Sequence, residues 1–264
     1  MLFALAGSAE AQHSGRVFRI GYLSAQSRSA EVFRLDGFRE ALRELGYEEG
    51  KNIVIDYRFA EGQFDRLREL AAELVRLNAD VILTGGSPGT RAAQQATRTI
   101  PLVMTLVGDP TEFVGSLAKP GGNVTGLTQI SPQLSGKRLE LLKEAFPKTS
   151  RVAVFVDAAV TAKQKSQNLR ETQLAADILG IKLQSLEIRG AHPDLDDAFR
   201  KAINERVSAV NVLSGPVLFL HRKRVVEFAA KRRLPAIYPH VEFVDDGGLL
   251  FYGPDFVDMF RRAA

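Results

Sequence analysis

Apolar and polar positions follow two different periods along this chain. Short apolar runs rich in β-branched residues predict buried parallel strands, because such strands are covered on both faces. Between them lie segments with an apolar residue every three or four positions, which predicts helices with one core-facing side. The predicted strands are residues 17–23, 53–59, 81–84, 102–106, 151–156, 182–188, 209–213, 236–238 and 249–252, and the predicted helices are residues 29–45, 64–77, 87–97, 135–146, 163–179, 195–206, 218–231 and 254–262. Strands that alternate with helices in this way predict right-handed βαβ units and parallel sheets.

The alternation is interrupted by a dense run of turn-forming residues from Lys119 to Asn123. Proline and glycine at this density favour a domain crossing. The sequence therefore predicts an N-terminal α/β lobe over residues 17–124 and a C-terminal α/β lobe over residues 128–247. Residues 248–264 are expected to cross back and to start a helix that packs on the first lobe. The predicted fold is α/β, with two doubly wound, Rossmann-like lobes and a ligand cleft between them.

One strand-to-helix turn concentrates candidate binding residues. The strand 81–84 is followed by Gly85 and Gly86, and Ser87 and Pro88 suit the cap and the first position of the next helix. Free backbone N–H groups at such a helix start attract anions. The turn lacks the spacing of a phosphate-binding loop and of a dinucleotide-binding fold. Direct ligand contact and a turn that only reverses the chain therefore both stay open.

The composition is that of a globular protein that can bury one large core or two ordinary ones. The chain has 264 residues, of which 45% are hydrophobic and 25% are charged. The net charge is only +4, and the one dense basic cluster, residues 221–224 with 231–233, lies at helical spacing. A solvated helix face explains this cluster, and no motif that reads nucleic acid accompanies it, so we expect no nucleic-acid partner. Contact of the cluster with a partner protein or a membrane surface stays open.

Residues that carry catalysis or hold metals are not grouped in this sequence. There is no cysteine, which excludes disulfides, thiol nucleophiles and cysteine metal sites. The four histidines lie far apart at no metal-ligand spacing, and no G-x-S-x-G motif occurs. Glu242, Asp245 and Asp246 are expected to line a solvated turn. We therefore expect no catalytic residue, no metal and no cofactor, and we do not expect an enzyme.

The first residues resemble the end of a secretory signal. Residues 1–7 are apolar, and small residues precede a cut after Ala11, although the basic start of such a signal is missing. Residues 1–11 are thus expected to be a signal peptide remnant, and a short apolar tag or helix stays open as the alternative. No later apolar run approaches the ~20 residues that a membrane span needs. The mature protein is therefore expected to be soluble and exported to the periplasm.

Several segments, in order from about Val17 to the end of the chain, resemble one protein family. They are GYLSAQS, LRELGY followed by EGKNI, YRFAEGQFDRL, LAAELVRLNADVIL, TGGSPGTRAA, IPLVM with GDP, KPGGNVTGLT, GKRLELLKEAFP and LPAIYPHVEFVDDGGLLFYG. They are similar to the ABC-transporter substrate-binding proteins of the tryptophan/tyrosine type. The resemblance implies export and a type I periplasmic-binding-protein fold that closes like a clamp on a small solute and delivers it to a membrane permease. Members of the family continue beyond the helix begun at Pro254, so the C-terminus is expected to be truncated.

In this architecture, the loops at the strand ends face the cleft. The residues expected to bind the ligand are Tyr22, Ser24, Ala25, Gly85, Gly86, Ser87, Thr90, Gly108, Asp109, Asp157, Ser214, Gly215, Tyr238, Tyr252 and Gly253. For an amino-acid-like ligand, the carboxylate is expected at the helix start near Ser87 and the ammonium on Asp109 or Asp157. An apolar tail could stack on Tyr22 or Tyr252. Capping by both aspartates and packing by both tyrosines stay open as alternatives.

The crossings between the lobes are expected to act as a hinge. The predicted hinge residues are Gly122, Asn123, Thr125, Gly126 and Gly248. A ligand that touches both lobes stabilises their closed arrangement. These features predict a monomeric solute-binding protein of an ABC importer, with permease subunits as partners and an amino acid or aromatic-acid-like molecule as solute. A small-molecule sensor or regulatory domain, or an enzyme of the same lobed fold, stays open as the alternative.

Overall fold

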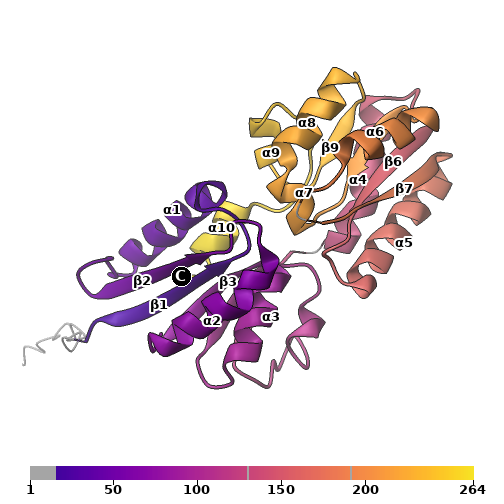
Figure 1. The fold of residues 1–264 in the computed structure, drawn as a ribbon. Coiled ribbons are helices and arrows are strands. Elements are labelled where there is room, and N and C mark those ends of the chain that lie inside the picture. The colour runs from indigo at the N-terminus through magenta and orange to yellow at the C-terminus, as the bar shows by residue number, and fades with distance from the viewer. Residues whose placement is uncertain (1–15, 130, 191) are drawn as a thin grey trace, which may run out of the picture.

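The computed structural model describes residues 16–129, 131–190 and 192–264, which form two α/β lobes (Figure 1). Within these residues each lobe holds one parallel sheet, with the strand orders β2-β1-β3-β4-β5 and β10-β9-β8-β6-β7. The elements of the first lobe are β1 (Phe18–Ser24), α1 (Arg28–Glu44), β2 (Ile53–Phe59), η1 (Phe64–Arg66), α2 (Leu67–Arg76), β3 (Val81–Gly85), α3 (Gly86–Ala96), β4 (Leu102–Val107), η2 (Pro110–Glu112), β5 (Val124–Thr128) and α10 (Phe256–Arg261). Those of the second lobe are α4 (Ser131–Ala145), β6 (Arg151–Asp157), α5 (Ala162–Leu179), β7 (Lys182–Ile188), α6 (Leu195–Asn204), β8 (Ala209–Val212), α7 (Pro216–Leu220), α8 (Arg222–Lys231), β9 (Ala236–Tyr238), α9 (Glu242–Asp245) and β10 (Leu250–Phe251). The predicted fold class is thus confirmed.

Helices cover both faces of the first sheet, which explains why its strands are apolar runs. Neighbouring residues of β3 point to opposite faces, so Ile82 packs in the core beside α2 and α3. Leu83 packs in the other core, which includes residues of α1 and α10. Buried on both faces, the parallel strands end in loops at one edge of the sheet, and this edge faces the second lobe (Figure 1).

The strand β5 belongs to the first sheet and precedes the first crossing. It pairs with β4, where Gly126 lies opposite Met104. Gly126 has a φ of +140°, and a Cβ atom at this position would lie 2.1 Å from the Met104 carbonyl oxygen, so only glycine fits. The turn-rich run 119–123 is therefore a loop inside the first lobe, and the chain crosses after Thr128.

The predicted hinge residues lie before the two crossings. Asn123 donates its Nδ2 to the Ile100 carbonyl oxygen at 2.8 Å and thereby ties the start of β5 to the first lobe. Gly122 is exposed, and a Cβ atom there would meet nothing within 4 Å. Thr125 and Gly126 lie within β5. Gly248 precedes β10, and its Cβ would lie 2.6 Å from the Phe243 carbonyl oxygen.

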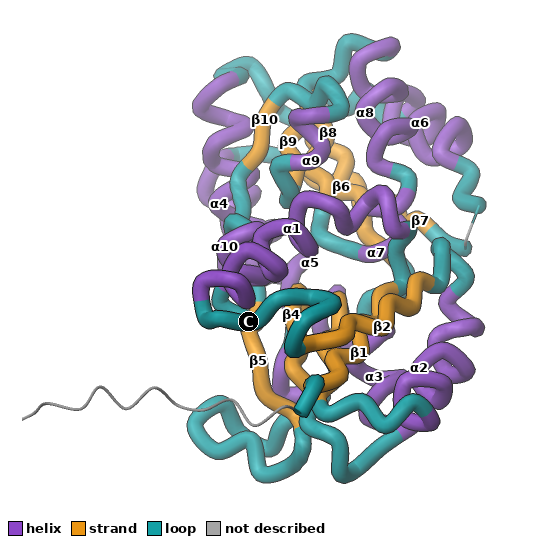
Figure 2. The backbone as a smooth tube through the Cα atoms, turned by 90° about the vertical axis from the view of Figure 1, so that its left-hand side faces the viewer, coloured by secondary structure: helices purple, strands orange, loops and turns teal. Residues whose placement is uncertain are grey.

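The last helix returns to the first lobe. α10 lies beside α1 in both views (Figures 1 and 2), although the second lobe separates the two in sequence. Phe260 is buried in the same core as Leu35 of α1. Arg261 forms ion pairs with Glu40 at 2.5 Å and Glu44 at 2.7 Å. The chain therefore crosses between the lobes a second time, after β10.

Two local predictions are wrong. The helix predicted over residues 218–231 starts earlier, at Pro216, and breaks at His221 into α7 and α8. The solvated turn predicted around Glu242 is the short helix α9, and the Glu242 side chain forms an ion pair with Arg34 of the first lobe.

The predicted signal peptide remnant, residues 1–11, lies outside the described residues. In the part of the chain that the structure does describe, none of the helices has the length and apolar character to cross a membrane.

Candidate functional site

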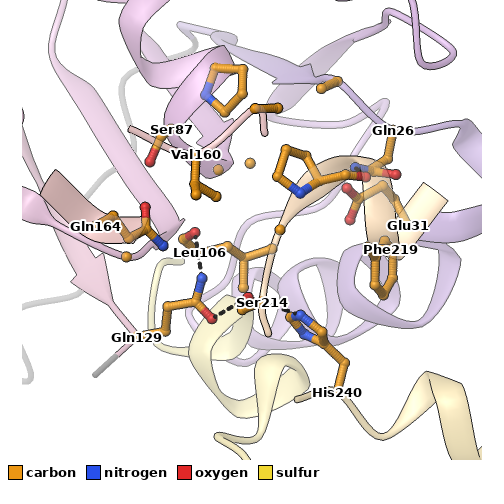
Figure 3. A pocket seen from close by; sticks show the side chains of 18 of the residues that line it. Gln26, Glu31, Ser87, Leu106, Gln129, Val160, Gln164, Ser214, Phe219 and His240 are labelled. Carbon is orange, nitrogen blue, oxygen red and sulfur yellow. Dashed lines mark hydrogen bonds between the residues drawn. The ribbon is translucent and has the colours of Figure 1, made fainter. Parts of the chain in front are cut away.

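A cavity lies between the lobes, where the strand-end loops of both sheets meet (Figure 3). It holds about 630 Å³ of empty volume, including the open solvent at its mouth. The lining from the first lobe and its crossing comprises Ala25, Gln26, Glu31, Arg34, Gly85, Gly86, Ser87, Pro88, Leu106, Gly108 and Gln129. The lining from the second lobe comprises Ala159, Val160, Gln164, Ser214, Gly215, Pro216, Phe219 and His240. A concave site lined by residues of two lobes is a common location for binding a small organic molecule.

Nearly half of the residues expected to bind a ligand line this cavity. They are Ala25, Gly85, Gly86, Ser87, Gly108, Ser214 and Gly215. The start of α3 is among them, and no side chain caps its first N–H groups. This leaves a helix N-terminus open toward the cavity, the arrangement that attracts an anionic group.

The three tyrosines expected at the ligand do not line the cavity. Tyr22 is completely buried and packs edge to face on Tyr57 and Phe59. Burial raises the pKa of the Tyr22 hydroxyl well above its usual value. Tyr238 is buried with its ring stacked on Phe243, the ring centroids 4.8 Å apart. Tyr252 is partly exposed, and its backbone oxygen accepts from Arg138.

The two aspartates expected at a ligand ammonium are engaged within the protein. Asp157 is buried, and its Oδ2 accepts from the backbone N–H of Val217 at 2.6 Å and of Leu218 at 2.9 Å. Asp157 therefore caps the start of α7, and burial raises the pKa of its carboxyl group. Asp109 lies 2.8 Å from Lys163 of the other lobe. Burial opposes ionisation of Asp109, but hydrogen bonds from Lys163 and Thr111 lower its pKa.

The other expected residues lie behind the lining. Ser24 donates its hydroxyl to Glu31 at 2.7 Å, and Thr90 donates its hydroxyl to the Gly86 carbonyl at 3.0 Å. A Cβ atom at Gly253 would lie 2.2 Å from the Pro239 carbonyl oxygen, so this glycine allows two segments of backbone to approach closely.

A buried ion cluster joins the lobes beside the cavity. The Arg34 side chain is 3% exposed, lies 3.4 Å from Glu31 and also pairs with Glu242 across the cleft. Its guanidinium group stacks 4.5 Å from the ring centroid of Phe219. Burial lowers the pKa of Arg34, but both carboxylates outweigh this and raise it, so the arginine is charged. The sequence offers no signal for this cluster, because its members come from two helices far apart in the chain.

Glutamine amides supply much of the remaining polar lining. Gln26 follows the end of β1, in a strand-end loop of the kind that the sequence analysis expects at the cleft. Gln164 lies in the first turn of α5, within a predicted helix, and the sequence analysis missed it. Gln129 directly follows β5 and was missed because that strand had been assigned to the crossing. At the β4–β5 register shift, Leu106 has a φ of +57°, and this residue is part of the cavity lining.

Contacts across the cleft hold the lobes together over the cavity. Gln26 donates its Nε2 to the Pro216 carbonyl at 3.2 Å, and Thr161 donates its hydroxyl to Glu112 at 2.7 Å. Gly108 approaches Gln164 so closely that a Cβ atom would lie 2.1 Å from the amide nitrogen. The structure is therefore that of a closed pair of lobes. Among the described residues, no group of three or more histidines, aspartates or glutamates is placed to hold a metal ion.

Comparison with known proteins places this architecture in a family. Residues 21–264 match the family model described as ABC transporter substrate binding protein. A curated relative, the tyrosine-binding protein of Clostridioides difficile, is 31% identical over 234 residues, which cover 86% of this chain and 65% of that protein. This chain thus spans just under two thirds of the length of that relative.

Solved structures share the fold. A conserved domain protein from Vibrio cholerae has a TM-score of 0.83 at 27% identity, with 94% of this chain and 83% of that chain covered. The ABC domain from Streptococcus pneumonia in complex with L-Trp has a TM-score of 0.81 at 22% identity, with 93% and 81% covered. These folds are those of type I periplasmic binding proteins. Together with the two-lobed fold and its cavity, the match over residues 21–264 shows that this chain belongs to the ABC transporter substrate binding protein family.

Proposed function

We propose that this protein captures a small organic solute, of the amino acid or aromatic acid type, and delivers it to the permease of an ABC importer. The solute binds in the cavity between the lobes, and the lobes close around it by bending at the two crossings. The protein acts outside the cytoplasm after export. The observation that carries this proposal is the cavity between the lobes, which residues of both lobes line and beside which hydrogen bonds join the two lobes.

The polar lining supports a small polar or zwitterionic solute. The open start of α3 suits a carboxylate, which is common to amino acids and aromatic acids. Apolar side chains such as Leu106, Val160 and Phe219 suit an apolar or aromatic tail. The names of the relatives are consistent with this class of solute, since one is a tyrosine-binding protein and another was solved with L-Trp.

A thermal-shift screen of this chain against amino acids, aromatic acids and small sugars tests the proposal. A specific solute at a hundred times its dissociation constant adds about 2.7 kcal/mol of stability, which is readily visible. Small-angle scattering with and without the hit then measures closure, since the open pair of lobes is more extended. A cooperatively folded protein that responds to none of these solutes would contradict the proposed solute class.

A further inference from the structure

Two charged side chains line the cavity within the described residues, and they pair with each other. The Glu31 side chain is 1% exposed, its Oε1 accepts the Ser24 hydroxyl at 2.7 Å, and its Oε2 lies 3.4 Å from Nη1 of Arg34. Arg34 also pairs with Glu242 of the second lobe. The described lining therefore holds no carboxylate that is free to neutralise a ligand ammonium group.

The two aspartates at the strand ends are also engaged, and neither lines the cavity. Asp109 accepts the Thr111 hydroxyl at 2.6 Å through its Oδ1, and its Oδ2 lies 2.8 Å from Nζ of Lys163. Asp157 accepts the backbone N–H of Ala159 at 2.8 Å through its Oδ1, while its Oδ2 caps α7. Neither carboxylate is thus presented to a solute in the cavity.

Positive charge acts on the side of the cavity where His240 lies. Burial and the charges of Arg34, Arg138 and Arg222 lower the pKa of His240 well below its usual value, so the ring is neutral. Arg34 and Arg222 have carboxylate partners. Arg138 is 1% exposed, and within the described residues it forms no ion pair and donates its Nε to the Tyr252 carbonyl at 2.8 Å. A buried positive charge without a counter-ion disfavours a second cation nearby and favours an anion.

Gln164 is a polar side chain of the second lobe that remains open to the cavity (Figure 3). It is 3% exposed, and among the described residues its side-chain amide forms no hydrogen bond, although its backbone N–H is capped by Thr161. The unpartnered amide oxygen of Gln26 is sealed from solvent, whereas the Gln164 amide is not. The Gln164 amide also approaches Gly108 of the first lobe. The closed lobes therefore present an uncharged amide of the second lobe to the solute.

The start of α3 supplies the matching groups from the first lobe. Gly85, Gly86 and Ser87 line the cavity there, and no side chain caps the first N–H groups of the helix. The partial positive charge of a helix start attracts a carboxylate and repels an ammonium group. The Gln164 amide can donate its Nε2 to a carboxylate, but it does not compensate the charge of an ammonium group. Both lobes thus offer donors that suit an anion.

We propose that the cavity accepts carboxylic acids without an ammonium group and rejects the corresponding α-amino acids, and that Gln164 determines this choice. A carboxylate at this position would bind an ammonium group, whereas the amide donates to an acid. The inference rests on the proposed function and narrows its solute class.

Pairs of probes that differ only by the α-ammonium group test this choice. They are hydrocinnamate against L-phenylalanine, phloretate against L-tyrosine and isocaproate against L-leucine, with the dissociation constants measured by calorimetry. The wild-type protein is expected to bind the acid of at least one pair about tenfold or more tightly than the amino acid, because the ammonium group is desolvated without a counter-charge. Hydrocinnamamide, the uncharged amide of hydrocinnamate, is expected to bind about tenfold or more weakly than hydrocinnamate, because it lacks the negative charge.

Gln164→Glu replaces the amide by a carboxylate of nearly the same shape. It is expected to weaken the acids and strengthen the amino acids, so the ratio of dissociation constants within a pair shifts by about 100-fold toward the amino acid. The measurements are made at about pH 8, because burial raises the pKa of a carboxyl group. Gln167→Glu, at an exposed position one turn further along α5, changes the net charge equally and is expected to keep the wild-type ratio. Thermal unfolding checks the fold of both variants, and Gln164→Asp, with the same charge on a shorter side chain, replaces Gln164→Glu if that variant does not fold.

The outcomes separate this inference from the proposed function. If neither member of any pair binds, the proposed solute class and the inference fall together. Amino acids that bind as tightly as their acids, or more tightly, would overturn the inference and leave the proposed function standing. A folded Gln164→Glu variant with the wild-type ratio, or hydrocinnamamide that binds as tightly as hydrocinnamate, would also overturn the inference alone.

Discussion

The contact between Gly108 and Gln164 gives a way to block closure without disturbing either lobe. The three atoms nearest to a Cβ built at Gly108 all belong to the Gln164 amide, at 2.1, 2.6 and 2.9 Å. Gly108 does not have a left-handed φ, so alanine is compatible with its backbone. Gly108→Ala is therefore expected to leave the first lobe folded and to act only where the lobes meet.

The magnitude follows from how the amide can move. Gln164 is 3% exposed and lines the cavity, so its amide must either push the lobes apart or turn into the space for the solute. Forcing extra volume into a packed contact costs about 1–3 kcal/mol. Because each 1.4 kcal/mol is a factor of ten in affinity, the solute is expected to bind about 5- to 150-fold more weakly.

Calorimetry with the solute found in the screen, together with urea unfolding of the free protein, measures both effects. The double variant Gly108→Ala with Gln164→Ala removes the obstructing amide and is expected to recover part of the affinity, which a double-mutant cycle quantifies. Gly115→Ala is the matched control, since a Cβ there would lie 3.9 Å from its nearest neighbour. Wild-type affinity in Gly108→Ala, or equal losses in the single and double variants, would refute the reasoning that the lobes close through this contact.

Three further variants test the energetics of the fold. Arg34→Met leaves the buried Glu31 without its ion pair and is expected to lower the free energy of unfolding in urea by about 3–5 kcal/mol. A decrease of less than about 1 kcal/mol would show that the fold does not need this ion pair. The folded pKa of His240 lies well below its unfolded value of 6.5, so below this pH the unfolded chain binds a proton that the folded chain does not. The stability contributed by the neutral His240 ring is therefore present above pH 6.5 and is lost as the pH falls, by up to about 1.4 kcal/mol per pH unit. His240→Phe is expected to lack this part of the dependence of the unfolding free energy on pH. Equal pH dependence in the wild type and the variant between pH 7 and 5 would contradict the burial of a neutral ring. Gly126→Ala places a Cβ atom 2.1 Å from the Met104 carbonyl oxygen, on a residue with a φ of +140°. The substitution is expected to destabilise the first lobe by about 2–4 kcal/mol, measured by thermal unfolding. A variant as stable as the wild type would mean that β5 lies elsewhere.

The sequence predicted the fold well because its local signals agree with one another. The nine predicted strands and most of the predicted helices lie within a few residues of their predicted limits, because the apolar periodicity and the turn residues mark the same boundaries, but β5 was not predicted as a strand. The exception is the run from Lys119 to Asn123, where dense turn residues form a loop between paired strands. Turn chemistry shows where a chain bends, but it does not show whether the next strand joins the same sheet.

Site residues could be predicted where the strand end alone decides their place. Gly85 is the last residue of β3, Ser87 and Ser214 follow buried strands, and all three line the cavity. Tyr22 lies two positions before the end of β1, and Tyr238 is the last residue of β9, where packing against other elements buries both side chains. Position near a strand end therefore does not by itself decide whether a side chain faces the cleft or the core.

Long-range partners could not be predicted. Asp157 follows the pattern of a ligand-binding carboxylate, yet it caps α7, which begins after a different strand. Arg34 and Glu242 are separated by most of the chain and meet only because the lobes are closed. Such pairs depend on the relative placement of elements, which no local period specifies.

The charged side chains of the described lining, and the two aspartates expected at the ligand, are engaged within the protein, and this separates closure from selection. Among the described residues, Asp157 caps a helix, Asp109 pairs with Lys163 across the cleft, and Arg34 holds two carboxylates. Recognition is then left to the uncharged amides, hydroxyls and imidazole of the lining and to the open start of α3. Loss of a closing ion pair should therefore weaken every solute by a similar factor, because it changes the closing equilibrium and not the contacts with the solute.

Lys163→Met tests this separation. The substitution removes the partner of Asp109 on a side chain that does not line the cavity, so the dissociation constants of a whole panel of solutes should rise together. A Lys163→Met variant that altered the ratio of affinities between two solutes, with the lobes still closing, would mean that the charges at the cleft take part in recognition and that closure and selection are one process.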